Sequence, residues 1–564
     1  MTFFTRTLAL LTLALLASCG GGGGGGGSGG NVVNSNLTFL SISTGSFTPG
    51  FNSGQLSYTS TVSFSTDMIT ITATPASNTA TVTINGNTTD SFSSVTLPLV
   101  IGENLFTITV NSGGSTKQYR LTITRQDRFD VETYLKSNSP EAEDSFGTHI
   151  AISEDTVVIG APGDDSDGSS ETDNSSLDSG AVFVFINNGN NWSQQAFIKA
   201  SNSGDDDGFG TSVAVSGDTL VVGAPREDAD GSSENDDSSM NSGAVYVFTR
   251  NGTSWTQQAY LKSSNLGTLD GFGSSVAIDG DTLLVGAVGE DGDGNLETDD
   301  SVSGSGAVYA FTRTGTTWTQ QTYIKASNPG AGDNFGHNVS MDADTAIVGA
   351  PYERSDGSSE ADDSVISSGA AYVFFRTGTT WLQQAYLKAG NAAASNFFGF
   401  SVSVDGDFAV VGAPEDSSDG SSEADASAVG SGSAHVFSRT GSAWSKQDYL
   451  KASNVEAGDG FGLSVVVNGD RIAVGAPGED GNGSSETNNA LTDSGAAYIF
   501  LQSGNTWEQQ NYIKAFNAGI EDIFGQSVDF DNDLLFVGAP DEDSDRISGQ
   551  NDVAESAGAA YIYR

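Results

Sequence analysis

Residues 209–225, with the sequence FGTSVAVSGDTLVVGAP, recur in similar form along this chain of 564 residues. Phe-Gly pairs start every 63 residues without slippage, at Phe146, Phe209, Phe272, Phe335, Phe398, Phe461 and Phe524. Self-similarity at a fixed period of this length indicates a repeat architecture, in which each copy is one structural unit.

Two other marks follow the same period. All six tryptophans lie on it, at Trp192, Trp255, Trp318, Trp381, Trp444 and Trp507. Gly-Ala-Pro lies on it too, at Gly160, Gly223, Gly349, Gly412, Gly475 and Gly538, and in the third copy Val288 replaces the proline. We interpret the aromatic positions as core between neighbouring units rather than as a sugar-binding platform, because buried repeats need bulky apolar filling.

Each copy predicts four strands. In the second copy they cover residues 212–215, 219–225, 244–248 and 255–262, separated by short turns and one long polar loop. Four strands per copy, repeated seven times, are typical of the blades of a β-propeller. We therefore predict an all-β chain, with a seven-bladed β-propeller over residues 127–564 that follows a small β-sandwich.

The seventh copy stops at Arg564, where its third strand ends. Subtracting seven periods places the missing fourth strand at residues 129–137, where Phe129 takes the tryptophan position. We expect this N-terminal strand to complete the last blade and close the ring, which removes both free edges. The paired Phe-Gly and Gly-Ala-Pro marks resemble the FG-GAP repeat, which builds the seven-bladed propeller of integrin α subunits.

Residues 37–125 read as short strands with turn signals between them. Thr81 to Ile84 runs into Asn85-Gly86, a strong hairpin signal. Apolar residues then alternate with polar ones over residues 106–110 and 119–123, as in half-buried strands. The segment resembles the cadherin-like β-sandwich of bacterial surface proteins, and because it has none of the clustered acidic motifs of calcium-binding cadherins, we interpret it as a spacer.

The N-terminus predicts export. Arg6 precedes an apolar stretch from Leu8 to Leu16, which is too short to span a bilayer. Leu16 to Cys19 resembles the bacterial lipoprotein signal, so residues 1–18 are expected to be a signal peptide and Cys19, the only cysteine, a lipidated N-terminus. Gly20 after the cysteine implies the outer membrane in that family. The alternative to lipidation is an ordinary signal peptide with an incidental cysteine. Residues 19–36 then form a Gly-rich tether.

The charge of the chain restricts its partners. Its formal net charge is −49, so no basic surface is available to neutralise phosphates, and nucleic acid is excluded as a partner. The same charge opposes adsorption to anionic lipid. It favours cations, basic partners or a saline environment.

The long loops repeat an acidic pattern of the form Asp-x-Asp-Gly-x-x-Glu. The candidate calcium ligands are Asp165, Asp167, Glu171, Asp228, Asp230, Glu234, Asp291, Asp293 and Glu297. Glycine permits a sharp turn while alternating oxygens converge, and calcium prefers six to eight oxygen ligands. Integrins carry a fuller acidic loop between Phe-Gly and Gly-Ala-Pro, where this chain has only a tight turn, so their sites do not transfer by position. The alternative is a solvated acidic loop that keeps the protein soluble.

Strand alternation places these acidic loops on the face that also holds the connections between blades. The opposite face holds the turns that carry Arg250, Arg313, Arg376 and Arg439, and the N-terminal strand enters there. We therefore expect the acidic face to point away from the membrane.

Catalysis has little support in the sequence. His149, His337 and His435 occupy different repeat positions, and none has the spacing of a metal site. We predict a lipid-anchored surface protein, not an enzyme, that binds an extracellular protein or glycan, with calcium as the candidate cofactor. The alternatives are a polysaccharide-processing propeller enzyme, which needs unlike polar residues in the central channel, and a structural part of an envelope assembly.

Overall fold

The computed structural model of the chain describes residues 34–62, 66, 68–89, 94–100, 102–125, 131–189, 191–234, 236–360, 362–483, 488–544 and 554–564. The chain divides into two compact units, Met1–Asp127 and Arg128–Arg564. The expected signal peptide, Cys19 and most of the tether lie outside the described residues. In the part that is described, no helix is long and apolar enough to cross a membrane.

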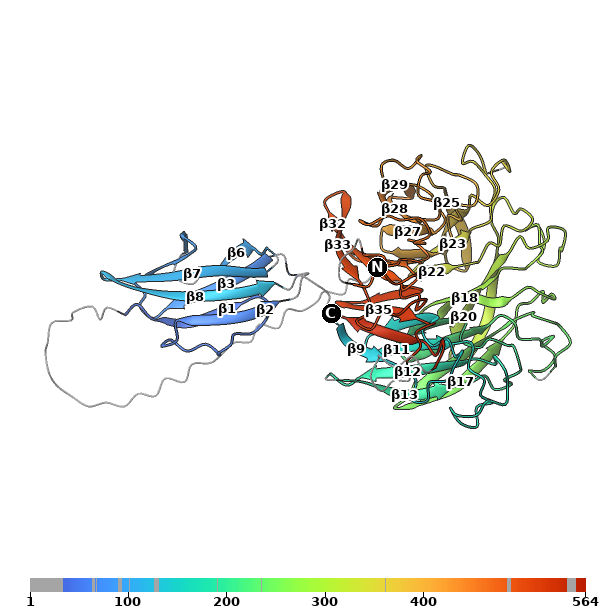
Figure 1. Cartoon of the computed structure of the whole chain (residues 1–564), viewed down its shortest axis with the longest axis horizontal. Coiled ribbons are helices and arrows are strands. Elements are labelled where there is room, and N and C mark those ends of the chain that lie inside the picture. Colours follow the sequence, from blue (N-terminus) through green and yellow to red (C-terminus); the bar gives the residue numbers. More distant parts are fainter. Residues whose placement is uncertain are drawn as a thin grey trace. The chain divides into compact units, whose positions relative to one another are not determined.

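The first unit is a β-sandwich, as the sequence predicted (Figure 1). Its smaller sheet contains β1 (Leu37–Ile42), β3 (Met68–Pro75) and β6 (Ser94–Pro98). Its larger sheet has the order β2 (Ser57–Val62), β8 (Ser115–Arg125), β7 (Gly102–Ser112), β4 (Thr81–Ile84) and β5 (Asn87–Thr89). Alternate residues of both sheets, such as Ile71, Ile108 and Leu121, are buried in one shared core.

The second unit consists of seven four-stranded antiparallel sheets, which confirms the predicted propeller (Figure 1). The blades, each written from its innermost strand outwards, are as follows. Blade 1 has β10 (His149–Ser153), β11 (Thr156–Ala161), β12 (Ala181–Asn187) and β13 (Trp192–Ile198). Blade 2 has β14 (Ser212–Ser216), β15 (Thr219–Ala224), β16 (Ala244–Asn251) and β17 (Ser254–Leu261). Blade 3 has β18 (Phe272–Asp279), β19 (Thr282–Ala287), β20 (Ala307–Thr314) and β21 (Thr317–Ile324).

Blades 4 to 7 repeat this order. Blade 4 has β22 (Val339–Asp342), β23 (Thr345–Ala350), β24 (Ala370–Thr377) and β25 (Thr380–Leu387). Blade 5 has β26 (Val402–Asp405), β27 (Phe408–Ala413), β28 (Ser433–Thr440) and β29 (Ala443–Leu450). Blade 6 has β30 (Ser464–Asn468), β31 (Arg471–Ala476), β32 (Ala496–Ser503) and β33 (Thr506–Ile513). Blade 7 has β34 (Ser527–Asp531), β35 (Leu534–Ala539), β36 (Ala559–Tyr563) and β9 (Val131–Leu135).

The ring closes through β9, the first strand of the propeller unit. It pairs antiparallel with β36, the last strand of the chain, with Leu135 opposite Ala560 and Thr133 opposite Ile562. The outer strand of blade 7 therefore comes from the opposite end of the propeller sequence. Every described blade then has four strands, and the edge of β36 is covered.

The repeated glycines meet where neighbouring blades touch. A Cβ atom on Gly349 of Gly-Ala-Pro would collide with the carbonyl oxygen of Gly399, the glycine of the next Phe-Gly pair. The same contact recurs around the ring and ends with Gly538 against Gly147. Gly399 also has a φ of 92°, a backbone conformation that residues with a Cβ atom rarely adopt. The two signature motifs are thus two halves of one contact between blades.

The apolar core lies between blades rather than within them. One cluster combines Val158 and Val184 of blade 1 with Phe209, Val213 and Tyr246 of blade 2, all essentially buried. The phenylalanine of each Phe-Gly pair is at most 1% exposed. Each blade therefore depends on its neighbours for its core, as in other repeat proteins.

Arginine and tryptophan connect the blades on the side opposite the long loops. Arg250 donates from Nε to Asp218 Oδ1 at 2.6 Å and from Nη1 to Thr156 Oγ1 of blade 1 at 2.8 Å. Its guanidinium lies 5.4 Å from the ring of Trp255, and Arg313, Arg376 and Arg439 repeat the arrangement. The tryptophans are thus structural, as expected from the sequence.

Candidate functional site

The long loops between the second and third strands lie together with the connections between blades. Backbone hydrogen bonds join each connection to a long loop. The amide of Asp206 donates to the Leu177 carbonyl at 2.8 Å, and one repeat later the amide of Leu269 donates to the Met240 carbonyl at 2.9 Å. The contact recurs around the ring and reaches Glu143, whose amide donates to Glu555 at 2.8 Å. We call this side of the propeller the loop face.

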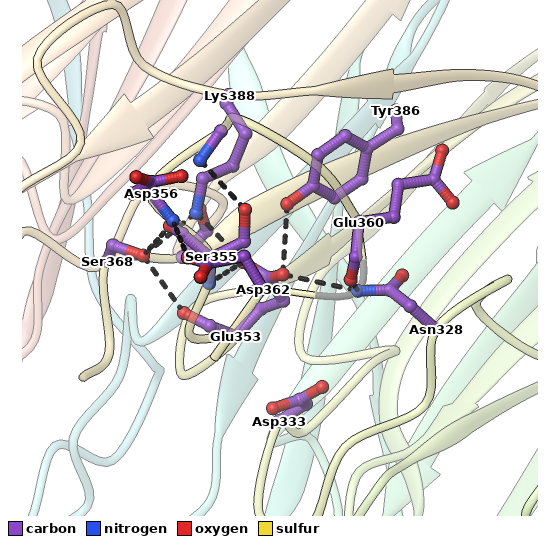
Figure 2. Close-up of polar contacts among 12 residues, drawn as sticks. Asn328, Asp333, Glu353, Ser355, Asp356, Glu360, Asp362, Ser368, Tyr386 and Lys388 are labelled. Carbon is purple, nitrogen blue, oxygen red and sulfur yellow. Dashed lines mark hydrogen bonds and ion pairs between the residues drawn. The ribbon is translucent and has the colours of Figure 1, made fainter. Parts of the chain in front are cut away.

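A buried ion pair holds each long loop onto its blade, and Figure 2 shows it for blade 4. Glu353 is 1% exposed, and its carboxylate lies 2.8 Å from Nζ of Lys388, the residue directly after the outer strand β25. The same carboxylate accepts hydrogen bonds from Tyr386 Oη at 2.9 Å and from Asn328 Nδ2 at 3.2 Å. Because Asn328 belongs to the connection from blade 3, the carboxylate joins two loops and one strand.

Among the residues that the structure describes, the ion pair recurs in every blade except blade 5. The pairs are Asp164 with Lys199, Glu227 with Lys262, Glu290 with Lys325, Glu353 with Lys388, Glu479 with Lys514 and Glu542 with Lys136. In blade 7, both Tyr134 and Lys136 come from β9 and its end, so the closing strand also completes this polar network.

These buried carboxylates were not predicted from the sequence. They stand among many other acidic residues of the loops, so residue type alone does not reveal that they are buried. Their signal is periodic: an acidic residue recurs 63 residues apart at Glu227, Glu290 and Glu353, and lysines recur at the same spacing at Lys262, Lys325 and Lys388.

The candidate calcium ligands have separate partners within each loop. Asp228 Oδ1 accepts from the amide of Asn241 at 2.6 Å, and Asp230 Oδ1 accepts from the amide of Ser232 at 2.7 Å. Glu234 instead accepts from Ser201 Oγ in the connection from blade 1. In the other two loops, Asp165 and Asp291 also cap the loop backbone, Asp167 and Asp293 close turns, and Glu171 and Glu297 accept side-chain hydrogen bonds.

These contacts are those of a self-supporting loop. Among the described residues, no group of three or more His, Cys, Asp or Glu side chains comes together as a metal site would need. Calcium binding by these loops stays a prediction.

A second set of buried carboxylates lies two residues before six of the seven Phe-Gly pairs. Asp333 Oδ2 accepts from the amide of Gly330 at 2.8 Å, and burial raises its pKa to about 6. Burial also raises the pKa of Asp270 to about 6, of Asp207 and Asp459 to about 7, and of Asp144 to about 8. In blade 5 the corresponding residue is Asn396.

These aspartates predict a stability that depends on pH. Their folded-state pKa values lie above the unfolded value, so the folded protein binds more protons and stability falls as pH rises through the folded pKa. We expect the free energy of unfolding to be a few kcal/mol higher at pH 6.5 than at pH 8.5, on the order set by the shifts of Asp144, Asp207 and Asp459. Urea unfolding followed by tryptophan fluorescence measures this difference.

Histidines limit the useful range of that experiment. Burial lowers the pKa of His149 to about 4 and also lowers the pKa of His337 and His435, so below about pH 6.5 they oppose the aspartates. Asp144→Asn, which introduces the residue of blade 5, is the matched variant and should flatten the profile. A wild-type profile that is already flat between these pH values would contradict the prediction.

The central channel contains polar residues that differ from blade to blade. It forms a cavity of about 440 Å³ lined by the inner strands, with His149, Asn338 and Asp529 among the lining residues. Asp529 accepts from the amide of Ile152 in blade 1 at 2.9 Å, and Asn338 Oδ1 accepts from Val402 in blade 5 at 2.9 Å. Asp529 and Asn338 therefore connect neighbouring inner strands, whereas the buried Nδ1 of His149 has no hydrogen-bond partner among the described residues. The channel thus contains the unlike polar residues that the enzyme alternative requires, and two of them hold blades together.

Comparison with known families agrees with this geometry. The sequence model of the FG-GAP repeat matches seven segments, namely residues 132–185, 192–248, 255–311, 318–374, 381–437, 444–500 and 507–563. The chain belongs to the FG-GAP repeat family. The model of the cadherin-like beta sandwich domain matches residues 35–126 in the same chain.

Membership of the FG-GAP family indicates the general class of role that the chain has. FG-GAP propellers and cadherin-like domains are typically binding modules without enzymatic activity. A search of curated proteins found no match to the chain. The FG-GAP assignment therefore indicates a binding or adhesion module in general terms.

Proposed function

We propose that this FG-GAP protein is exported, lipidated at Cys19 and held at the cell surface in the outer membrane, where its loop face binds an extracellular protein or glycan. Two parts of the chain support the proposal. The lipoprotein-like residues 16–19 support the anchor, and the loop face supports binding.

The observation that carries the proposal is the mixed character of the loop face. The same repeat position bears an exposed apolar side chain in four blades, where Leu177, Met240, Ile366 and Val429 are 54–68% exposed. Exposed carboxylates such as Asp230 and Asp356 lie on the same loops. Apolar side chains that remain exposed within a charged rim are typical of a surface that contacts a partner.

The anchor is tested with the variant Cys19→Ser. In cells that export the wild-type chain, we expect the wild type to fractionate with membranes and to be cleaved by protease added to intact cells. The variant should no longer incorporate labelled fatty acid and should leave the membrane fraction. Fatty-acid incorporation that persists in Cys19→Ser would overturn the lipid assignment.

Binding by the loop face is tested with residues 20–564 on arrays of glycans and extracellular proteins. Asp230→Asn with Asp356→Asn should weaken binding of any ligand captured by the wild type, and added salt should weaken it as well. The matched control is Asp155→Asn with Asp470→Asn, which removes exposed charges from turns on the opposite side. Equal losses in both variants would argue against the loop face.

Calcium is tested by thermal unfolding of residues 20–564 in chelator and then in millimolar calcium, at constant ionic strength. A ligand that binds only the folded state raises the melting temperature, and 100-fold excess over its Kd contributes about 2.7 kcal/mol. A rise with calcium that magnesium does not reproduce, and that Asp228→Asn with Asp291→Asn reduces, is the expected result if the loops hold the ion. An equal response to both cations would leave the loops as solvated charge.

A further inference from the structure

Lys451 in blade 5 is the exception among the repeated lysines. The chain has nine lysines, and seven of them occupy the repeat position that ends the outer strand. Six of these seven contact a buried carboxylate at 2.6–3.1 Å. Among the described residues, no carboxylate lies within ion-pair distance of Lys451.

The cause is a pair of substitutions in blade 5. Asp416 stands where most blades have glutamate, and Asn396 stands where the others have aspartate. Asp416 Oδ2 accepts from Asn391 Nδ2 at 2.6 Å and from Asn396 Nδ2 at 3.4 Å. Asp416 Oδ1 accepts from the amide of Ser418 at 2.9 Å and from Tyr449 Oη at 3.1 Å, so both oxygens of the shorter carboxylate have partners other than the lysine.

Blade 1 shows that the shorter aspartate side chain does not by itself abolish the ion pair with the lysine. Asp164 also replaces glutamate there, yet it lies 3.1 Å from Lys199 Nζ. Blade 1 has Ser139 and Asp144 where blade 5 has Asn391 and Asn396, so the two side-chain amides that bind Asp416 have no equivalent there. The combination of aspartate with two amides is what removes the ion pair.

The remaining contacts of Lys451 suit a neutral amine. Its Nζ donates to Ser431 Oγ at 2.7 Å and to the Gly432 carbonyl at 2.5 Å. Lys388 in blade 4 has three acceptors for its three protons, namely Glu353, Ser368 Oγ and the Gly369 carbonyl. Lys262 and Lys514 have two acceptors, as Lys451 does, but one of theirs is a carboxylate, whereas both acceptors of Lys451 are neutral. A neutral amine can serve both with its two protons and keep a free lone pair.

The surroundings of Lys451 also favour its neutral form. Burial lowers its pKa to about 8, although Asp416, Asp459 and Asp419 oppose the change. Burial lowers the pKa of His435, and the charges of Lys446 and Lys451 lower it further. Lys451 lines a surface cavity of about 510 Å³ together with Asp419, Gly420 and Glu456.

From this geometry we propose that the Lys451 amine is a site of covalent modification by small aldehydes, which reach it through the cavity beside blade 5. The nitrogen lone pair attacks the carbonyl carbon, the C=O electron pair moves to oxygen, and a proton transfers from nitrogen to that oxygen. The resulting carbinolamine loses water as the C=N bond forms, which leaves an imine. A hydride donor such as cyanoborohydride then reduces the imine to a stable secondary amine.

The test is competitive labelling of the full chain. Propanal and cyanoborohydride are added briefly at pH 8, and peptide mass spectrometry compares Lys451 with Lys262, Lys325, Lys388 and Lys514. We expect Lys451 to react about 10-fold faster than these ion-paired lysines, because a larger fraction of its amine is neutral. Equal rates at Lys451 and Lys388 would overturn the proposal.

Two reciprocal variants separate the ion pair from other features of blade 5. Asp416→Glu with Asn396→Asp recreates the residues of blade 4 and should bring Lys451 down to the rate of Lys388. Glu353→Asp with Asp333→Asn introduces the residues of blade 5 into blade 4 and should make Lys388 reactive. Labelling of Lys451 that stays unchanged in the first variant, with an intact melting curve, would contradict the proposal.

Discussion

Replacing Glu353 by alanine is expected to lower the free energy of unfolding of the propeller by about 3–5 kcal/mol, the usual cost of leaving one partner of a buried ion pair alone. Lys388 would be left without its counter-charge in a site where its side chain is 8% exposed. Tyr386 and Asn328 would lose their acceptor at the same time. Urea unfolding followed by tryptophan fluorescence reports on the propeller alone, because all six tryptophans lie between residues 192 and 507.

Two further variants identify the origin of that loss. Glu353→Gln with Lys388→Met removes both charges but keeps an acceptor for Tyr386, so it should recover most of the stability. Glu360→Ala, in the same loop but half-buried, should cost less than about 1 kcal/mol. If Glu353→Ala and Glu360→Ala shift the urea midpoint equally, the buried pair does not hold the loop.

The repeat period predicted the propeller because every blade buries the same residues against its neighbours. Phe209 and Phe272 are fully buried at equivalent positions, and the glycines Gly349 and Gly399 meet in a contact that admits no side chain. Such requirements act on every copy, so they leave a strict pattern in the sequence. For the same reason the tryptophans could be assigned to structure.

The polar interior of the loop face could not be predicted in the same way. Glu227, Asp228 and Asp230 look alike in a sequence, but only Glu227 is buried against a lysine, and Asp228 and Asp230 support the loop backbone. Which carboxylate points inward depends on loop conformation rather than on residue type. The candidate calcium residues were therefore chosen by a pattern that also suits a turn closed by its own aspartates.

The second large effect is expected from removing the closing strand. A chain without residues 129–137 loses β9, so β36 is left as an open edge in blade 7. It also loses Lys136, which lies 2.6 Å from Glu542, a residue that is 2% exposed. The unpaired glutamate alone should cost about 3–5 kcal/mol, and the exposed edge favours aggregation. Urea unfolding and light scattering measure the two consequences.

Moving the strand rather than removing it provides the matched control. Residues 129–137 can follow Arg564 through a short turn like that of blade 2, where Asn251 ends β16 and Ser254 begins β17. Blade 7 would then be built from consecutive strands, as blades 1 to 6 are, and Lys136 could again reach Glu542. We expect this rearranged chain to regain the urea midpoint of the wild type, because the contacts of β9 rather than its place in the sequence stabilise the ring. A rearranged chain as unstable as the deletion would show that closure depends on the N-terminal connection itself.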